Sequence, residues 1–95
     1  MATYIVFMRE RMQDPAAFDK YMEAVPPTMA GHAVRPIALY GRMQMLEGEA
    51  LEGAVIAEFP TWNAAMAWYN SPAYQEARKI RMKAGDYRVF ITEGL

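Results

Sequence analysis

Residues 55–81 read VIAEFPTWNAAMAWYNSPAYQEARKIR, and this stretch decides the fold that we predict. Its first five residues alternate β-branched or aromatic side chains with small or acidic ones, the pattern of a half-buried strand. Pro60 ends the strand because proline has no backbone donor for the ladder. Thr61 and Ser71 each supply a capping hydroxyl, and Pro72 suits the first position of a helix. The stretch therefore predicts one strand followed by a helical region that is interrupted before Ser71.

The chain before this stretch predicts a strand and a helix. The run from Tyr4 to Met8 is almost continuously apolar, as in a strand that is covered on both faces. Asp14-Pro15 suits a helix start, and apolar residues then recur at spacings of three and four as far as Val25. The pair Pro26-Pro27 is expected to interrupt this helix, because each proline removes a backbone donor.

Two more strands complete the predicted set. One is expected from Val34 to Tyr40, where Pro36 indicates an edge position or a bulge. The segment MQMLEG at 43–48 either extends that strand or pairs back on it as a ribbon. After the helical region ends at Gly85, residues 87–92 (YRVFIT) predict the last strand.

The predicted order is β-α-β-β-α-β, which is the ferredoxin-like pattern of an antiparallel sheet with its helices on one face. In the first strand Ile5 and Phe7 point to one face, whereas Tyr4, Val6 and Met8 point to the other. Both faces are therefore apolar, and the face without helices would be an exposed patch. Two copies that stack these faces about a two-fold axis remove the patch. We expect a dimeric α+β barrel, so that the expected partner is a second copy of the chain.

Length and composition narrow the functional classes. The chain has 95 residues, 54% of them hydrophobic, a net charge of −1 and no cysteine. The length predicts a single domain with a small core. The near-zero net charge gives no electrostatic reason to expect binding to nucleic acid or to a membrane surface, and the lack of cysteine excludes a thiolate metal site. The N-terminus has no cationic lead before its apolar run, and no run approaches the length of a membrane span. The default expectation is a cytoplasmic protein.

Several segments together resemble a known family. They are the early tyrosine strand, DPAAFDKY, EFPTWNAAMAWYNSPAYQEARKIR and the closing RVFITEG. They resemble the short bacterial proteins of domain of unknown function thirteen-thirty, in the dimeric α+β-barrel superfamily, over nearly the whole chain. The resemblance implies a barrel dimer with a pocket between sheet and helices, and no established activity. The sequence departs from the family pattern at GHAVRPIALYGR, where the family usually has a glycine-rich run. His32 and Pro36 are therefore unusual for the family.

Two residues are candidates for proton transfer. His32 is the only histidine, and its ordinary pKa lies near neutrality, although a solvated or loop-capping role is the favoured explanation for it. Glu58 faces away from Val55, Ala57 and Phe59. It is a general base in the pocket, one half of an ion pair with Arg81 or Arg42, or simply exposed. No second histidine and no cysteine accompanies them, so that neither a metal site nor a bound cofactor is expected.

Other residues are candidates for binding a substrate. Arg81 follows Tyr74 by seven positions on one helix face, where it can turn inward to hold a carboxylate. Trp62, Met66 and Tyr69 share a helical stripe that is expected in the core. For the aromatic candidates, the alternative to binding a substrate is that they simply fill the core. The substrate-binding candidates are Arg81, Arg35, Tyr40, Trp68, Tyr69 and Tyr74.

Two functions fit these observations. The first is a cofactor-independent enzyme (an isomerase, lyase or monooxygenase) that acts on a small apolar or aromatic molecule. In such an enzyme, Glu58 or His32 would transfer protons, while Arg81, Arg35 and Tyr40 would orient the oxygen atoms of the substrate. The second is a non-catalytic, dimeric module that binds a small ligand or has a protective role. The superfamily includes cofactor-free monooxygenases, lactone isomerases and haem-degrading enzymes, and a shared fold does not choose among them.

Overall fold

A computed structural model describes all residues from 1 to 95. It contains four strands and three helices, and the expected element order is confirmed. The elements are β1 (Thr3–Met12), α1 (Pro15–Thr28), β2 (Arg35–Leu39), β3 (Gly53–Phe59), α2 (Trp62–Tyr69), α3 (Pro72–Ala84) and β4 (Gly85–Glu93).

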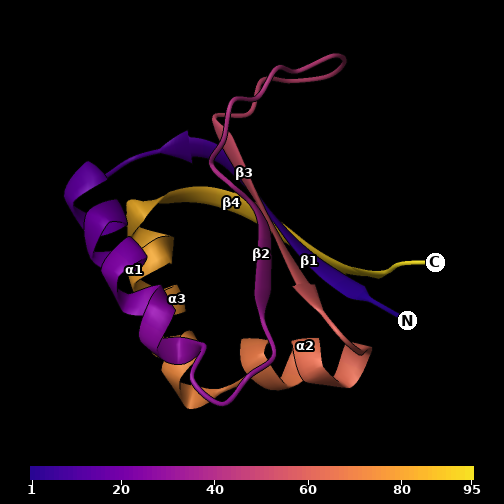
Figure 1. Cartoon of the computed structure of the whole chain (residues 1–95). Coiled ribbons are helices and arrows are strands. Elements are labelled where there is room, and N and C mark those ends of the chain that lie inside the picture. The colour runs from indigo at the N-terminus through magenta and orange to yellow at the C-terminus, as the bar shows by residue number, and fades with distance from the viewer.

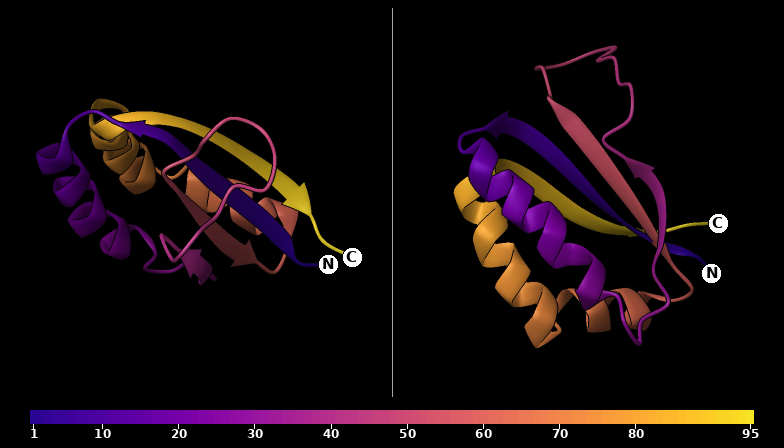
Figure 2. Two further views of the ribbon diagram at one scale, coloured as in Figure 1. Left: turned by 90° about the horizontal axis from the view of Figure 1, so that it is seen from above. Right: turned by 60° about the vertical axis from the view of Figure 1, so that its left-hand side comes forward.

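The strands form one antiparallel sheet in the order β2-β3-β1-β4. The helices lie on one side of this sheet, with α1 beside α3 (Figures 1 and 2). The ferredoxin-like α+β fold predicted from the sequence is thereby confirmed. β1 is a central strand although it comes first in the chain, because it pairs with β3 on one side and with β4 on the other.

The two faces of the sheet differ in what covers them. Ile5 and Phe7 of β1 face the helices and are only 2% and 4% exposed. Val6 points the other way, and its register partners are Ile56 on β3 and Phe90 on β4. No helix covers this second face (Figure 1), and Phe90 is 46% exposed on it. We call it the open face.

Aromatic rings form the centre of the core. Trp68 of α2 lies with its ring centroid 4.2 Å from Tyr74 and 5.6 Å from Phe59. Its indole Nε1 donates to Oγ1 of Thr28 over 3.1 Å, which ties the end of α1 to α2. Pro60 and the Thr61 cap separate β3 from α2, and the Ser71 hydroxyl accepts from the Tyr74 amide at the start of α3.

Three details of the sequence prediction are corrected. α1 continues through Pro26-Pro27 to Thr28 although each proline removes a donor, because the Thr28 hydroxyl donates to the Val25 carbonyl and accepts from the Trp68 indole, which hold the last turn in place. Residues 43–48 form no strand and are exposed. The prediction that Trp62 lies in the buried stripe of α2 is wrong, because Trp62 is 42% exposed. The buried residues of that helix are Ala65 and Trp68.

The expected role of Pro36 is confirmed. β2 is an edge strand, and its register with β3 shifts between Pro36 and Ala38. An edge position tolerates the missing proline donor, and the irregularity turns the strand locally. None of the three helices is long and apolar enough to cross a lipid bilayer.

Candidate functional site

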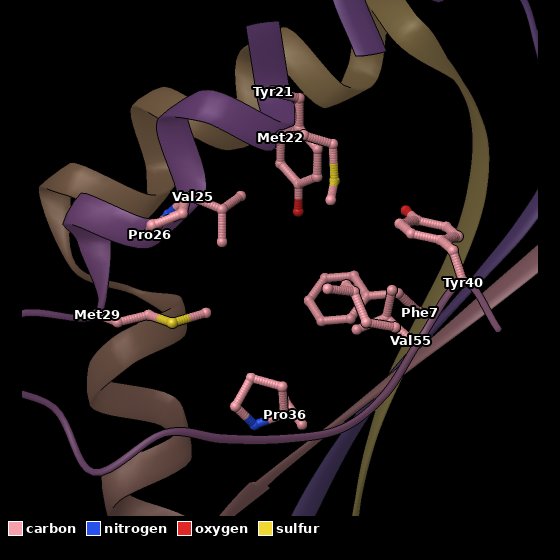
Figure 3. A pocket seen from close by; sticks show the side chains of 11 residues that line it. Phe7, Tyr21, Met22, Val25, Pro26, Met29, Pro36, Tyr40 and Val55 are labelled. Carbon is pink, nitrogen blue, oxygen red and sulfur yellow. The ribbon is translucent and has the colours of Figure 1, made fainter. Parts of the chain in front are cut away.

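A cavity of about 230 Å³ lies between α1, β2 and the helix-facing side of the sheet. α1 packs against α3 rather than against β2 (Figure 2). Eleven residues line this α1–β2 cavity, and Figure 3 shows their side chains converging on it. They are Phe7, Tyr21, Met22, Val25, Pro26, Met29, Pro36, Leu39, Tyr40, Val55 and Ala57.

The wall of the cavity is apolar for reasons that are visible in the sequence. The inward stripe of α1 contributes Met22 and Val25, and the next turn adds Met29. Val55 and Ala57 face inward because they alternate with outward-facing residues of β3. A cavity with such walls excludes water unless polar groups hold it.

The polar end of the cavity is formed by tyrosine hydroxyls. Tyr21 and Tyr40 come from α1 and from the residue after β2, and in Figure 3 the Tyr21 oxygen points into the cavity. The Tyr21 hydroxyl lies 2.9 Å from that of Tyr74, and the Tyr40 hydroxyl lies 2.7 Å from that of Tyr87. Two hydrogen-bonded tyrosine pairs therefore form the boundary of the cavity at this end.

Burial raises the pKa of Tyr21, Tyr40 and Tyr74 well above the ordinary value of a phenol. For Tyr40 the hydrogen bond with Tyr87 raises the pKa further, and the positive charge of Arg81 opposes the rise at all three residues. These three hydroxyls keep their protons at neutral pH. They act as hydrogen-bond donors rather than as bases.

Arg81 lies behind this end as a buried cation. The residue is 5% exposed, and its guanidinium carbon is 5.5 Å from the Phe7 ring centroid and 5.2 Å from that of Tyr87. Its Nε and Nη1 atoms are buried without a hydrogen-bond partner, and no carboxylate forms an ion pair with it. The rings of Phe7 and Tyr87 stabilise the charge, and the residue also borders a hollow that it shares with Arg78 and Asp86.

Tyr40 has an unusual backbone, with φ at 50°. Non-glycine residues seldom adopt this left-handed region, and such residues cluster at functional sites. The ring is held between Phe18, at 5.3 Å between centroids, and the Arg9 guanidinium, 5.0 Å from the ring centroid. A Cβ atom at Gly53 would lie 2.7 Å from Cδ1 of Tyr40, so the absence of a side chain there admits the ring.

The structure places both candidate bases outside the α1–β2 cavity. Glu58 lies with Ile56 on the open face, where its nearest cation is Arg35 at 3.7 Å and not Arg81 or Arg42. His32 is half-buried in the turn between α1 and β2. Neither residue lines the α1–β2 cavity, and Arg35 is exposed on the same side as Glu58.

The remaining candidates divide between the cavity and the core. Tyr40 lines the cavity, and Tyr74 and Arg81 lie directly behind it. Trp68 is a core residue, and Tyr69 lines a separate hollow between α2 and β4. No group of three or more histidine, aspartate or glutamate side chains gathers anywhere in the structure as a metal site would require.

Sequence reasoning did not assign Tyr21 or Tyr87 to a site. Tyr21 was visible only as one member of the apolar stripe of α1. Its hydroxyl was the available signal, because a buried tyrosine usually finds a partner for its O–H group. Tyr87 is the first aromatic residue of the last strand, and its distance in sequence from Tyr40 hides their contact.

The fold recurs in solved structures. A protein of unknown function from Rhodopseudomonas palustris is 24% identical, with a TM-score of 0.72 over 99% of this chain and 82% of that one. A dimeric ferredoxin-like protein of unknown function from Jannaschia sp. CCS1 is 19% identical, with a TM-score of 0.73 over 99% of this chain and 100% of that one. SnoaB, a cofactor-independent oxygenase from Streptomyces nogalater, is 13% identical, with a TM-score of 0.67 over 98% and 91%.

Among curated proteins none matches the chain significantly. The profile of the family described as Domain of unknown function (DUF1330) matches residues 2–95, which is nearly the whole chain. The protein therefore belongs to the DUF1330 family and has the ferredoxin-like fold of the solved structures above.

Proposed function

We propose that the α1–β2 cavity binds a small, largely apolar or aromatic molecule, and that the protein acts on this molecule as a cofactor-independent enzyme. The observation that carries the proposal is the cavity itself, an apolar space of about 230 Å³ with polar groups at one end only. Sites for small molecules commonly combine apolar walls with a few convergent polar groups. An apolar cavity of about 150 Å³ already holds benzene. The expected ligand has one or two rings.

The chemistry supported by this end of the cavity is stabilisation of negative charge on a ligand oxygen. The hydroxyls of Tyr21 and Tyr40 are available there as hydrogen-bond donors, and Arg81, which lies over the Phe7 ring outside the lining, adds a buried positive charge. Fixed donors aimed at a developing oxyanion contribute strongly when water is excluded. Isomerisation, proton abstraction and oxygen insertion next to a carbonyl can all begin from an enolate. SnoaB, which shares the fold, is described as a cofactor-independent oxygenase and supports this class of reaction.

A second candidate is non-catalytic ligand binding. The cavity lining contains no carboxylate and no imidazole, so that no group there accepts a proton readily at neutral pH. The tyrosines do not supply such a base, since burial raises the pKa of Tyr21 and Tyr40. This observation favours a binding module if the ligand is not turned over.

The bicyclic ketone 2-tetralone tests both candidates. With methionine methyl groups labelled with ¹³C, we expect it to shift the NMR signals of Met22 and Met29, which line the cavity, and not that of exposed Met82. Val55→Phe fills the cavity and is expected to weaken binding at least tenfold, whereas Leu46→Phe, in the exposed loop, leaves binding unchanged. Unshifted Met22 and Met29 signals at millimolar ligand would contradict the proposal.

Turnover separates the enzyme from the binding module. In D₂O, a C–H proton next to the ketone of 2-tetralone passes to the solvent, and the resulting enolate takes a deuteron from D₂O, so that deuterium replaces hydrogen at that carbon. The enzyme reading predicts that the protein accelerates this exchange over buffer, and that Val55→Phe abolishes the acceleration. Binding without acceleration supports the non-catalytic module.

We also propose that the open face packs against a second copy of the chain. Val6, Ile56 and Phe90 present apolar surface there, with Tyr4 and Met8 beside them on β1. Stacking two such faces about a two-fold axis buries them. The Jannaschia protein, which is described as dimeric, supports this arrangement.

Phe90→Glu is expected to convert the dimer into a monomer. The substitution places a carboxylate, which is costly to bury, on a side chain that is 46% exposed in the single chain. We expect a rise in the dimer dissociation constant of about thirtyfold or more, measured by light scattering after size exclusion. Met82→Glu on α3, at a position that is 60% exposed, is the control and is expected to stay dimeric. A wild-type protein that is monomeric at micromolar concentration would overturn the proposal.

A further inference from the structure

We propose that the polar end of the α1–β2 cavity is an oxyanion site, and that the ligand is a phenol or an enol that binds in its ionised form. Arg81 supplies the positive charge, and the hydroxyls of Tyr21 and Tyr40 donate hydrogen bonds to the ligand oxygen. This inference rests on the proposed function, since it names the class of molecule that occupies the same cavity.

The first step of the argument concerns the unpartnered charge. Burying a guanidinium is costly unless an anion or hydrogen-bond acceptors compensate it. Arg81 is 5% exposed and has neither at its Nε and Nη1 atoms. Arg9 shows the usual arrangement, in which a carboxylate lies beside the guanidinium, because Glu52 is 3.6 Å from it. Arg81 therefore lacks a counter-ion that a ligand can bring.

The second step concerns the hydroxyl protons. Each tyrosine pair has two O–H protons but only one hydrogen bond, at 2.9 Å between Tyr21 and Tyr74 and at 2.7 Å between Tyr40 and Tyr87. Either oxygen of a pair can be the donor. When Tyr74 and Tyr87 donate to their partners, the protons of Tyr21 and Tyr40 are free for a third acceptor. The cavity end then offers two donors to one ligand oxygen.

The third step concerns the shape of the site. Phe7 lines the cavity, and the Arg81 guanidinium carbon lies 5.5 Å from its ring centroid, so the charge is close to the apolar space. Apolar walls such as Val55 and Ala57 surround the remainder of the cavity. A flat ring with a single ionised oxygen fits this division better than a molecule that is polar at both ends. Phenols and enols have that form.

The charged and titratable groups around the site come from five segments. Tyr21 comes from α1, Tyr74 and Arg81 from α3, Tyr40 from the end of β2, and Tyr87 from β4. From β1, Arg9 lies 5.0 Å from the Tyr40 ring centroid, and Glu52 offsets its charge. Arg78 and Arg81, both on α3, are the cations near the site without an anionic partner, and of these two it is Arg81 whose charge acts on Tyr21 and Tyr40 as well as on Tyr74. It therefore sets the sign of the field at the ligand oxygen.

The test uses 4-nitrophenol, whose ionised form is yellow. Titrating its absorbance with pH at saturating protein gives the pKa of the bound phenol. We expect this pKa to fall by at least one unit relative to free 4-nitrophenol, which is a tenfold rise in its ionisation constant. Arg81→Met is expected to remove the fall, and Tyr21→Phe and Tyr40→Phe are each expected to reduce it. Arg81→Lys keeps the charge and is expected to retain part of the effect.

The matched controls are Arg78→Met and Tyr69→Phe. Arg78 lies on the same helix as Arg81 and borders the same hollow outside the α1–β2 cavity, but only Arg81 lies over the Phe7 ring that lines the cavity. Tyr69 lines the hollow between α2 and β4. Both variants are expected to leave the bound pKa unchanged. The wild-type titration needs no variant, so that poor folding of Arg81→Met does not weaken the test.

The outcomes separate the two proposals. If 4-nitrophenol or 2-tetralone shifts the Met22 and Met29 methyl signals but the bound pKa is unchanged or raised, the oxyanion site is overturned and the proposed function stands. Benzoate that binds at the same methyl groups more tightly than 4-nitrophenolate would also overturn the assignment to phenols and enols. If neither ring compound shifts these signals, the proposed function itself fails.

Discussion

Replacing Trp68 by alanine is expected to lower the free energy of unfolding by about 3–5 kcal/mol. The side chain is 2% exposed and contacts the rings of Tyr74, Phe59 and Phe7 at centroid distances of 4.2, 5.6 and 6.3 Å. Alanine leaves a cavity among three rings that cannot all move inward. It also removes the donor of the hydrogen bond to Thr28, which holds the last turn of α1. A domain of this size has only about 5–15 kcal/mol of stability, so the variant loses a large share.

Urea denaturation followed by circular dichroism measures this loss without relying on the removed fluorophore. Trp62→Ala is the matched control, because Trp62 begins the same helix and is 42% exposed. We expect the control to lose less than about 1 kcal/mol. Equal losses in the two variants would show that Trp68 does not have the central position in the core that we describe.

Gly85→Ala is expected to destabilise the protein by about 3 kcal/mol, at the upper end of the usual cost of overpacking. A Cβ atom at this position would overlap the backbone carbonyl oxygen of Arg11, and it would lie 3.2 Å from Cα of Met12. Both neighbours are main-chain atoms of β1, which pairs with β4 at this point. Because no flexible side chain can move aside, the two paired strands themselves must separate.

Gly41→Ala is the control for this experiment. Nothing lies within 4 Å of a Cβ atom built at Gly41, and its backbone is not left-handed. Thermal unfolding of the two variants compares them directly, and only Gly85→Ala is expected to lower the melting temperature by more than a few degrees. A normal melting temperature for Gly85→Ala would mean that β1 and β4 are less closely paired at this end than described.

Much of the fold could be predicted because its signals are local. Alternation in residues 55–59, the Thr61 and Ser71 caps and the prolines at helix starts each specify an element without knowledge of its neighbours. The errors occurred where a distant contact decides the outcome. α1 passes through two prolines because Trp68 bonds to Thr28, and Trp62 is exposed because α2 turns Ala65 and Trp68 toward the sheet.

The candidate site was predicted less completely, and Arg81, Tyr40 and Tyr74 were the residues found near it. The alternation of β3 already placed Glu58 with Ile56, but it does not tell which face the helices cover. The two tyrosine pairs were hidden because each joins elements that are distant in sequence. The cavity results from how α1 and α3 pack, and residue periodicity does not specify that distance.

The central position of β1 has a consequence for the order in which the molecule is assembled. β1 leaves the ribosome before the three strands that follow it, yet Thr3 pairs with Phe59 on β3 and with Glu93 on β4. Closing such long loops costs entropy before any contact repays it, which slows folding. Until β4 has been synthesised, the edge of β1 is unpaired and Ile5 and Phe7 have only part of their cover. The nascent chain thus exposes the residues that the finished protein buries most deeply.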